Sequence, residues 1–96
     1  MKKCEFYSLV MGEHGEPIAK QWDGYTDIYF NYYKNEFGQW FAIEPSTGLS
    51  VVQANTRKEA QYKATMPAMF KKINEKITQE MIFNFKNLVL EAEMEV

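Results

Sequence analysis

Apolar and polar residues alternate over the first half of the chain, with the period of two that is typical of β-strands. The first of these runs begins at Lys3 and is followed by a loop of about five residues that contains two glycines. Asp23-Gly24 and Pro45-Ser46-Thr47-Gly48 are turn signals between later runs. The pattern predicts a meander of four or five antiparallel strands, covering residues 3–11, 18–22, 25–34, 39–44 and 49–54.

The period changes to that of helices after Ala54. Thr56 can cap a helix, and Glu59 lies three residues later, as in a capping box. Two apolar stripes follow that are more than about 90° apart on one helix, with Pro67 at the change of phase; their members are Ala60, Ala64 and Ala68, then Met66, Phe70, Ile73 and Ile77. Because proline interrupts a helix, we predict one helix over 56–65 and a second that begins near Pro67.

The end of the chain fits two interpretations. Apolar residues at helical spacing continue the second stripe, but others lie on the opposite side, and residues 82–90 also have the composition of a strand. We favour a helix and keep a final strand as the alternative. A helix that is apolar on both sides must be covered twice, which would favour a dimer or a partner contact. The two sets are Ile77, Met81, Phe85, Leu88 and Ala92, and Ile82, Phe83 and Leu90.

These elements define the predicted fold class: α+β, an antiparallel four- to five-stranded meander packed against one or two C-terminal helices. The chain has 96 residues, too few for two independent cores. No linker or internal repeat interrupts it. We therefore predict a single domain over 1–96, with the sheet in 1–55 and mainly helical structure in 56–94.

Aromatic residues are unusually dense in the predicted sheet, where nine of the twenty residues from Trp22 to Phe41 are aromatic. In the predicted strand 25–34, Ile28, Phe30 and Tyr32 would share one face and Tyr29 would share the other with Tyr33. One face must pack on the helices, and a domain of this size cannot bury every ring. The remaining rings suit a protein contact, since Tyr and Trp give large contact areas. The predicted partner-binding residues are Tyr25, Tyr29, Tyr33, Trp40 and Phe41.

Charge is unevenly distributed along the chain. Residues 1–55 have four basic and seven acidic residues, a net charge of −3. Residues 56–86 have seven basic and three acidic residues, a net charge of +4. Residues 87–96 carry three glutamates. The first helices could therefore present a basic face on an acidic protein.

Single-stranded nucleic-acid binding is the alternative function that this basic face suggests. Sheet aromatics can stack bases while basic side chains contact phosphates. The pI of about 5.4 and the negative sheet region count against it. The candidate phosphate contacts are Lys34, Arg57, Lys58, Lys71 and Lys72, with Lys63 and Lys76 beside them.

Catalytic and metal-binding patterns are missing from the sequence. His14 is the single histidine and lies in a polar turn, while Cys4 is the single cysteine. The five glycines are isolated, so they match neither the phosphate-loop motif nor the dinucleotide-binding fingerprint. No apolar run reaches the roughly 20 residues of a membrane span. We expect no enzyme activity, cofactor, metal or membrane contact, and a cytoplasmic location.

One segment, residues 40–64, resembles a pattern in small uncharacterised bacterial, phage and mobile-element proteins. Thr47-Gly48-Leu49 ends a turn between two strands, and Thr56-Arg57-Lys58-Glu59-Ala60 begins a helix. The resemblance implies an accessory protein of phage or mobile-element type and transfers no active-site residue. With the aromatic surface, it suggests a small non-enzymatic protein-binding or regulatory module, with self-association as one form of the contact.

Overall fold

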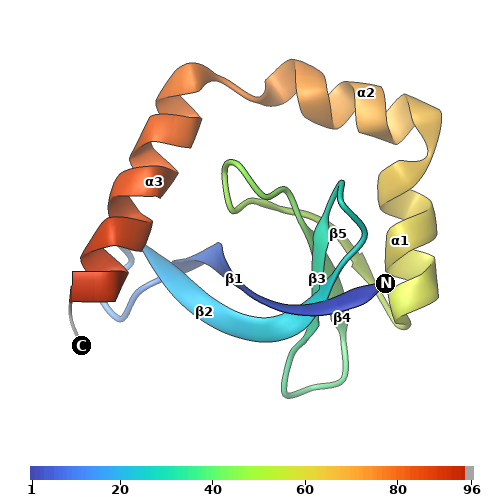
Figure 1. The fold of residues 1–96 in the computed structure, drawn as a ribbon, viewed down its shortest axis with the longest axis horizontal. Helices are drawn as coiled ribbons and strands as arrows, with labels where there is room; N and C mark the ends of the chain where they lie inside the picture. The colour runs from blue at the N-terminus through green and yellow to red at the C-terminus, as the bar shows by residue number, and fades with distance from the viewer. Residues whose placement is uncertain (95–96) are drawn as a thin grey trace.

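The computed structural model describes residues 1–94, which form an α+β fold with five strands followed by three helices (Figure 1). The strands pair in chain order, and every neighbouring pair is antiparallel, so the predicted meander is confirmed. The strands are β1 (Lys2–Met11), β2 (Pro17–Thr26), β3 (Asn31–Lys34), β4 (Trp40–Ile43) and β5 (Ser50–Ala54). The helices are α1 (Arg57–Thr65), α2 (Pro67–Lys76) and α3 (Gln79–Met94).

The β1–β2 hairpin is longer than the sequence predicts. It pairs Lys2 with Thr26 at one end and Met11 with Pro17 at the other. The turn predicted at Asp23-Gly24 is therefore wrong, because β2 continues through both residues. A Cβ atom on Gly24 would lie 2.1 Å from the carbonyl oxygen of Tyr32. Glycine is needed here for the close approach of β3 and not for a turn.

The chain turns instead at residues 27–30, inside the segment predicted as one strand over 25–34. That strand is wrong: β2 ends at Thr26, and β3 contains only Asn31–Lys34. Ile28 consequently does not share a face with Phe30 and Tyr32. Phe30 and Tyr32 are buried, whereas the side chain of Ile28 is exposed.

One face of the sheet is covered by helices, as predicted. The ladder places Tyr32, Ala42 and Val52 on this face, and they form the main core with Ala60 and Ala64 of α1. The small alanine side chains let α1 lie close to β3, β4 and β5. The predicted cap of α1 is confirmed, since the Glu59 amide donates to Thr56 Oγ1 at 3.1 Å.

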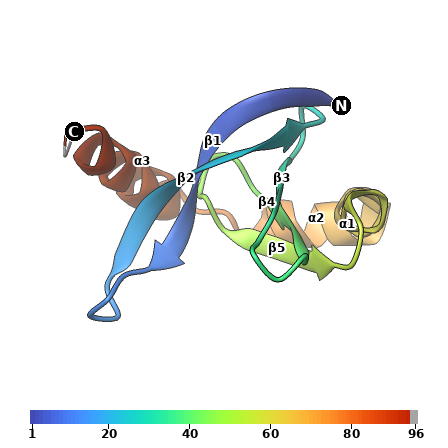
Figure 2. The ribbon, with the colours of Figure 1, turned by 90° about the horizontal axis from the view of Figure 1, so that it is seen from below.

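The opposite face has a smaller core, which consists of Phe6, Tyr33 and Ile43. Strands β1 and β2 are long and curved, and they arch across the rest of the sheet (Figure 2). The Leu9 amide donates to the carbonyl oxygen of Gly48 at 2.8 Å, which ties β1 to the β4–β5 turn. The curvature lets the sheet bury apolar side chains on a face to which no helix of the described chain adds a core residue.

The helical part has three helices, where one or two were predicted. Pro67 is the first residue of α2, as expected, but the backbone of Ile77 is extended and ends that helix. Thr78 then caps α3, because its Oγ1 accepts from the Met81 amide at 3.2 Å. The favoured helix at the end of the chain is confirmed. It packs on β2 and extends along the side of the sheet away from α1 (Figure 1).

Candidate functional site

The turn between β2 and β3 is held by one carboxylate. Asp27 Oδ1 accepts from the amides of Tyr29 and Phe30 at 3.1 and 2.8 Å. Asp27 Oδ2 accepts from the Tyr32 hydroxyl at 2.8 Å and from Gln61 Nε2 of α1 at 3.1 Å. The four bonds join the turn, the core and α1, so the conformation of the turn is fixed by its surroundings.

Ile28 occupies a strained position inside this turn. Its φ is +85°, and it is the one non-glycine residue of the described chain with a positive φ. For a β-branched residue this conformation costs roughly 1–3 kcal/mol. The side chain is 89% exposed and gains little burial in return. The sequence therefore keeps an isoleucine where glycine or asparagine would fit the backbone better.

Tyr29 lies beside Ile28 and is 59% exposed. Its ring packs edge-on against Phe70 of α2, with 5.6 Å between the ring centroids. Phe70 also makes an edge contact with the buried ring of Phe30, at 5.9 Å. Ile28 and Tyr29, with the partly buried ring of Phe70 as their base, form an apolar surface that we name the β2–β3 tip. The hydrogen bonds to Asp27 fix the backbone of the β2–β3 tip, and the contact with Phe30 fixes the ring of Phe70.

A second group of predicted residues gathers around Tyr25. The ring centroids of Tyr25 and Trp40 are 6.2 Å apart, and the Arg57 guanidinium lies over the Tyr25 ring at 4.2 Å. Lys34 pairs with Trp40 in the ladder and is exposed. We name Tyr25, Trp40, Arg57 and Lys34 the basic aromatic cluster. A guanidinium stacked on a ring keeps its edge available for an anion.

The third group lies on the opposite face of the sheet. Tyr33 is stacked between Trp22 and Phe41, with centroid distances of 4.0 and 5.3 Å. Both faces of its ring are covered, and only 8% of the residue is exposed. Burial raises the pKa of the Tyr33 hydroxyl above its ordinary value. Tyr33 is thus part of the core, and Phe41 is half-buried beside it.

The five predicted partner-binding residues are consequently divided among three places. Tyr29 belongs to the β2–β3 tip, Tyr25 and Trp40 to the basic aromatic cluster, and Tyr33 and Phe41 to the stack. Sequence reasoning missed Ile28 as a surface residue and did not foresee the contact of Tyr29 with Phe70. The signal for Ile28 was its position after Asp27, which favours a turn through side-chain bonds to the following amides.

The predicted phosphate contacts are also divided. Lys34 and Arg57 both belong to the basic aromatic cluster, whereas Lys58 is exposed elsewhere on α1. Lys71 of α2 lies 4.0 Å from Glu75 on the same helix. Lys72 lines a groove of about 340 Å³ between α2 and the β4–β5 turn, with Lys76 and Glu44. The structure does not assemble the lysines of α2 with the aromatic rings of Tyr25 and Trp40.

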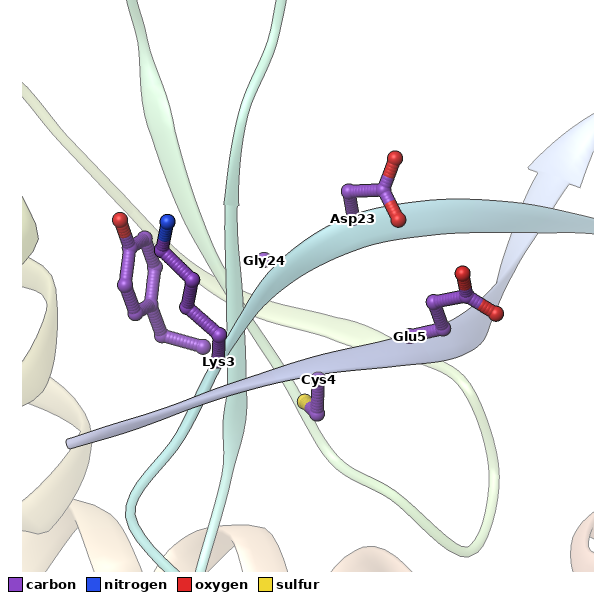
Figure 3. A pocket seen from close by; sticks show the side chains of 6 residues that line it. Lys3, Cys4, Glu5, Asp23 and Gly24 are labelled. Atoms are coloured by element: carbon purple, nitrogen blue, oxygen red, sulfur yellow. The ribbon is translucent and has the colours of Figure 1, made fainter.

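The side chains that could take part in a chemical reaction are separated from one another. A shallow hollow of about 490 Å³ lies on the β1–β2 hairpin. Figure 3 shows the side chains that line it, with Cys4 pointing away from Lys3, Glu5 and Asp23. Burial raises the pKa of the Cys4 thiol, which lowers its thiolate fraction. The buried Glu44 carboxylate accepts hydrogen bonds from Ser46 and Thr47 and so holds the β4–β5 turn.

Neither a metal-binding cluster nor a membrane-spanning helix occurs in residues 1–94. Among these residues, no group of three or more His, Cys, Asp or Glu side chains is arranged to hold a metal ion. None of the helices described has the length and apolar character needed to cross a membrane.

Comparison with protein-family models, with curated proteins and with solved structures finds no match to this chain. Function must therefore be argued from the surfaces described above.

Proposed function

We propose that this protein is a small protein-binding module and that the β2–β3 tip is its contact surface. The observation that carries the proposal is Ile28, which is 89% exposed at a φ of +85°. A strained residue persists only where its surroundings fix it, and such residues cluster at functional sites. The resemblance to accessory proteins of phage and mobile elements is compatible with this role.

The β2–β3 tip has the properties of a binding anchor. It combines an aliphatic side chain with an exposed tyrosine, and tyrosine is enriched at the centre of interfaces. The four hydrogen bonds to Asp27 fix the turn before any partner arrives. Binding would therefore cost little additional conformational entropy. An apolar pocket on a partner protein is the complementary surface.

Site-specific photo-crosslinking in the source cells tests this proposal. A benzophenone amino acid at position 29 should give one discrete adduct with another protein. The matched control is position 37, because Phe37 is also an exposed aromatic residue in a turn, 80% exposed, and lies at the opposite end of β3. No adduct from position 29, equal adducts from both positions, or an adduct with a second copy of this chain would contradict the proposal.

Nucleic-acid binding remains a second candidate because of the basic aromatic cluster. Arg57 stacked on Tyr25, next to Trp40 and Lys34, combines rings with cations. The carboxylates of Glu5 and Asp23 lie near this cluster, directly opposite each other on the hairpin, and oppose a phosphate backbone.

A labelled single-stranded oligonucleotide tests this second function. If it holds, binding at about 50 mM salt should weaken steeply as salt rises. Arg57→Gln should weaken it about tenfold, as expected for the loss of one charge-assisted phosphate contact. Lys71→Gln, which changes a cation outside the cluster, is the control. Absence of binding at about 50 mM salt would exclude this function.

A further inference from the structure

Helix α3 has an apolar stripe on the side that faces away from the sheet. Phe85 is buried against Gly48 of the β4–β5 turn, so that side of the helix is covered. Phe83, Leu90 and Met94 are 63%, 49% and 82% exposed. At 100° per residue these three side chains lie within about 40° of one another on the helix, opposite Phe85. The helix is thus covered on one side only.

The spacing of the exposed stripe is that of a coiled-coil seam. Positions 83, 87, 90 and 94 are separated by four, three and four residues, which is the alternation that keeps side chains facing a second helix. Asn87 is the polar member of this series. A single asparagine in such a seam is known to select pairing geometry at some cost in stability.

Charged residues flank the stripe in a self-complementary arrangement. Lys86 and Glu93 are seven residues apart and therefore lie on the same flank of α3. Neither makes an ion pair within residues 1–94. In an antiparallel pair of identical helices the same flanks face each other, which places Lys86 against Glu93 of the second copy, twice by symmetry.

We propose that the outer stripe of α3 binds a second copy of this chain, with the two α3 helices antiparallel. The C-terminal end of α3 is acidic, because its last turn has no basic residue and Glu91 and Glu93 lie in or near that turn. Acidic residues are unfavourable at the C-terminal end of a helix and favourable near an N-terminal end. The antiparallel arrangement brings these glutamates toward the N-terminal half of the other α3. A parallel arrangement would place Glu91 against Lys86 of the second copy but would keep the acidic last turns of both helices at the same end of the pair.

The size of the contact predicts a weak dimer. A helix of 16 residues is about 24 Å long. Two such helices bury less than the roughly 1,600 Å² of a standard interface. Helix α3 lies on the side of the molecule away from α1 (Figure 1), and α1 contacts the β2–β3 turn through the bond from Gln61 to Asp27. Self-association would therefore leave the proposed partner contact accessible, and the two proposals can fail separately.

Sedimentation equilibrium of the whole chain tests the dimer. The mass should rise from 11.3 kDa toward twice that value between about 1 µM and 1 mM, the range in which small interfaces dissociate. Phe83→Glu should keep the chain monomeric throughout. Tyr62→Glu is the matched control, since Tyr62 is 69% exposed on α1. A constant monomer mass for the unaltered chain, or an unchanged dimer in Phe83→Glu, would overturn the proposal.

Charge reversal tests the orientation. Lys86→Glu should weaken the dimer about tenfold, because two attractive contacts become repulsive. Adding Glu93→Lys to that variant should restore the affinity. Circular dichroism of each variant reports whether α3 remains folded. Restoration by Glu91→Lys in place of Glu93→Lys would indicate a parallel pair and would refute the antiparallel arrangement.

Discussion

Replacing Asp27 with alanine is expected to lower the free energy of unfolding by about 3 kcal/mol. The carboxylate accepts four hydrogen bonds, and one donor is the hydroxyl of Tyr32, a residue with no exposed surface. Removing the acceptor leaves that buried hydroxyl and the part-buried amide of Phe30 without a partner. Urea unfolding, followed by tryptophan fluorescence, measures the loss.

The control for this prediction is Asp23→Ala. Asp23 is an exposed carboxylate in β2, four residues before Asp27; it faces Glu5 across the hairpin and accepts no hydrogen bond in the described structure. Its removal relieves a repulsion between like charges and should leave stability unchanged or slightly raised. A loss below about 1 kcal/mol for Asp27→Ala, the value of one ordinary hydrogen bond, would show that the carboxylate does not organise the turn.

Replacing Ile28 with glycine is expected to stabilise the isolated protein by about 1 kcal/mol. Glycine adopts positive φ without steric cost, so the strain of the isoleucine is released. The exposed side chain contributes little burial that could be lost. The greater freedom of glycine in the unfolded chain offsets part of the gain. For a domain of this size the melting temperature should rise by roughly 4–8 °C.

The matched control for this change is Phe37→Gly. Phe37 is an exposed residue of the β3–β4 turn, and its φ is not positive. Glycine there releases no strain and should give no gain in stability. Equal effects at the two positions would mean that the conformation of Ile28 carries no stored free energy.

The strand order and the helix starts could be predicted from sequence because they depend on local chemistry. The period-two runs gave β1, β4 and β5, while Thr56 and Pro67 marked the starts of α1 and α2. The separation of α3 was missed because the apolar spacing continues across Ile77. What ends α2 there is the extended backbone of Ile77, and Thr78 then caps the next helix.

The candidate site could be predicted only in part. A dense aromatic segment indicated surplus ring surface, and Tyr29 is indeed exposed. Which rings are covered depends on contacts between distant elements, such as Trp22 and Phe41 on Tyr33. Gly24 was read as a turn residue because the sequence does not reveal the approach of the Tyr32 carbonyl. With a turn expected at Gly24, the sequence did not indicate that the turn begins at Asp27.

If the proposed function holds, Ile28 is retained for contact with a partner and not for stability. The most direct measurement combines Ile28→Gly with the benzophenone reporter at position 29. This chain should melt at a higher temperature and should no longer form the adduct. A chain that forms the adduct as efficiently as one with Ile28, or that is destabilised by the substitution, would contradict it.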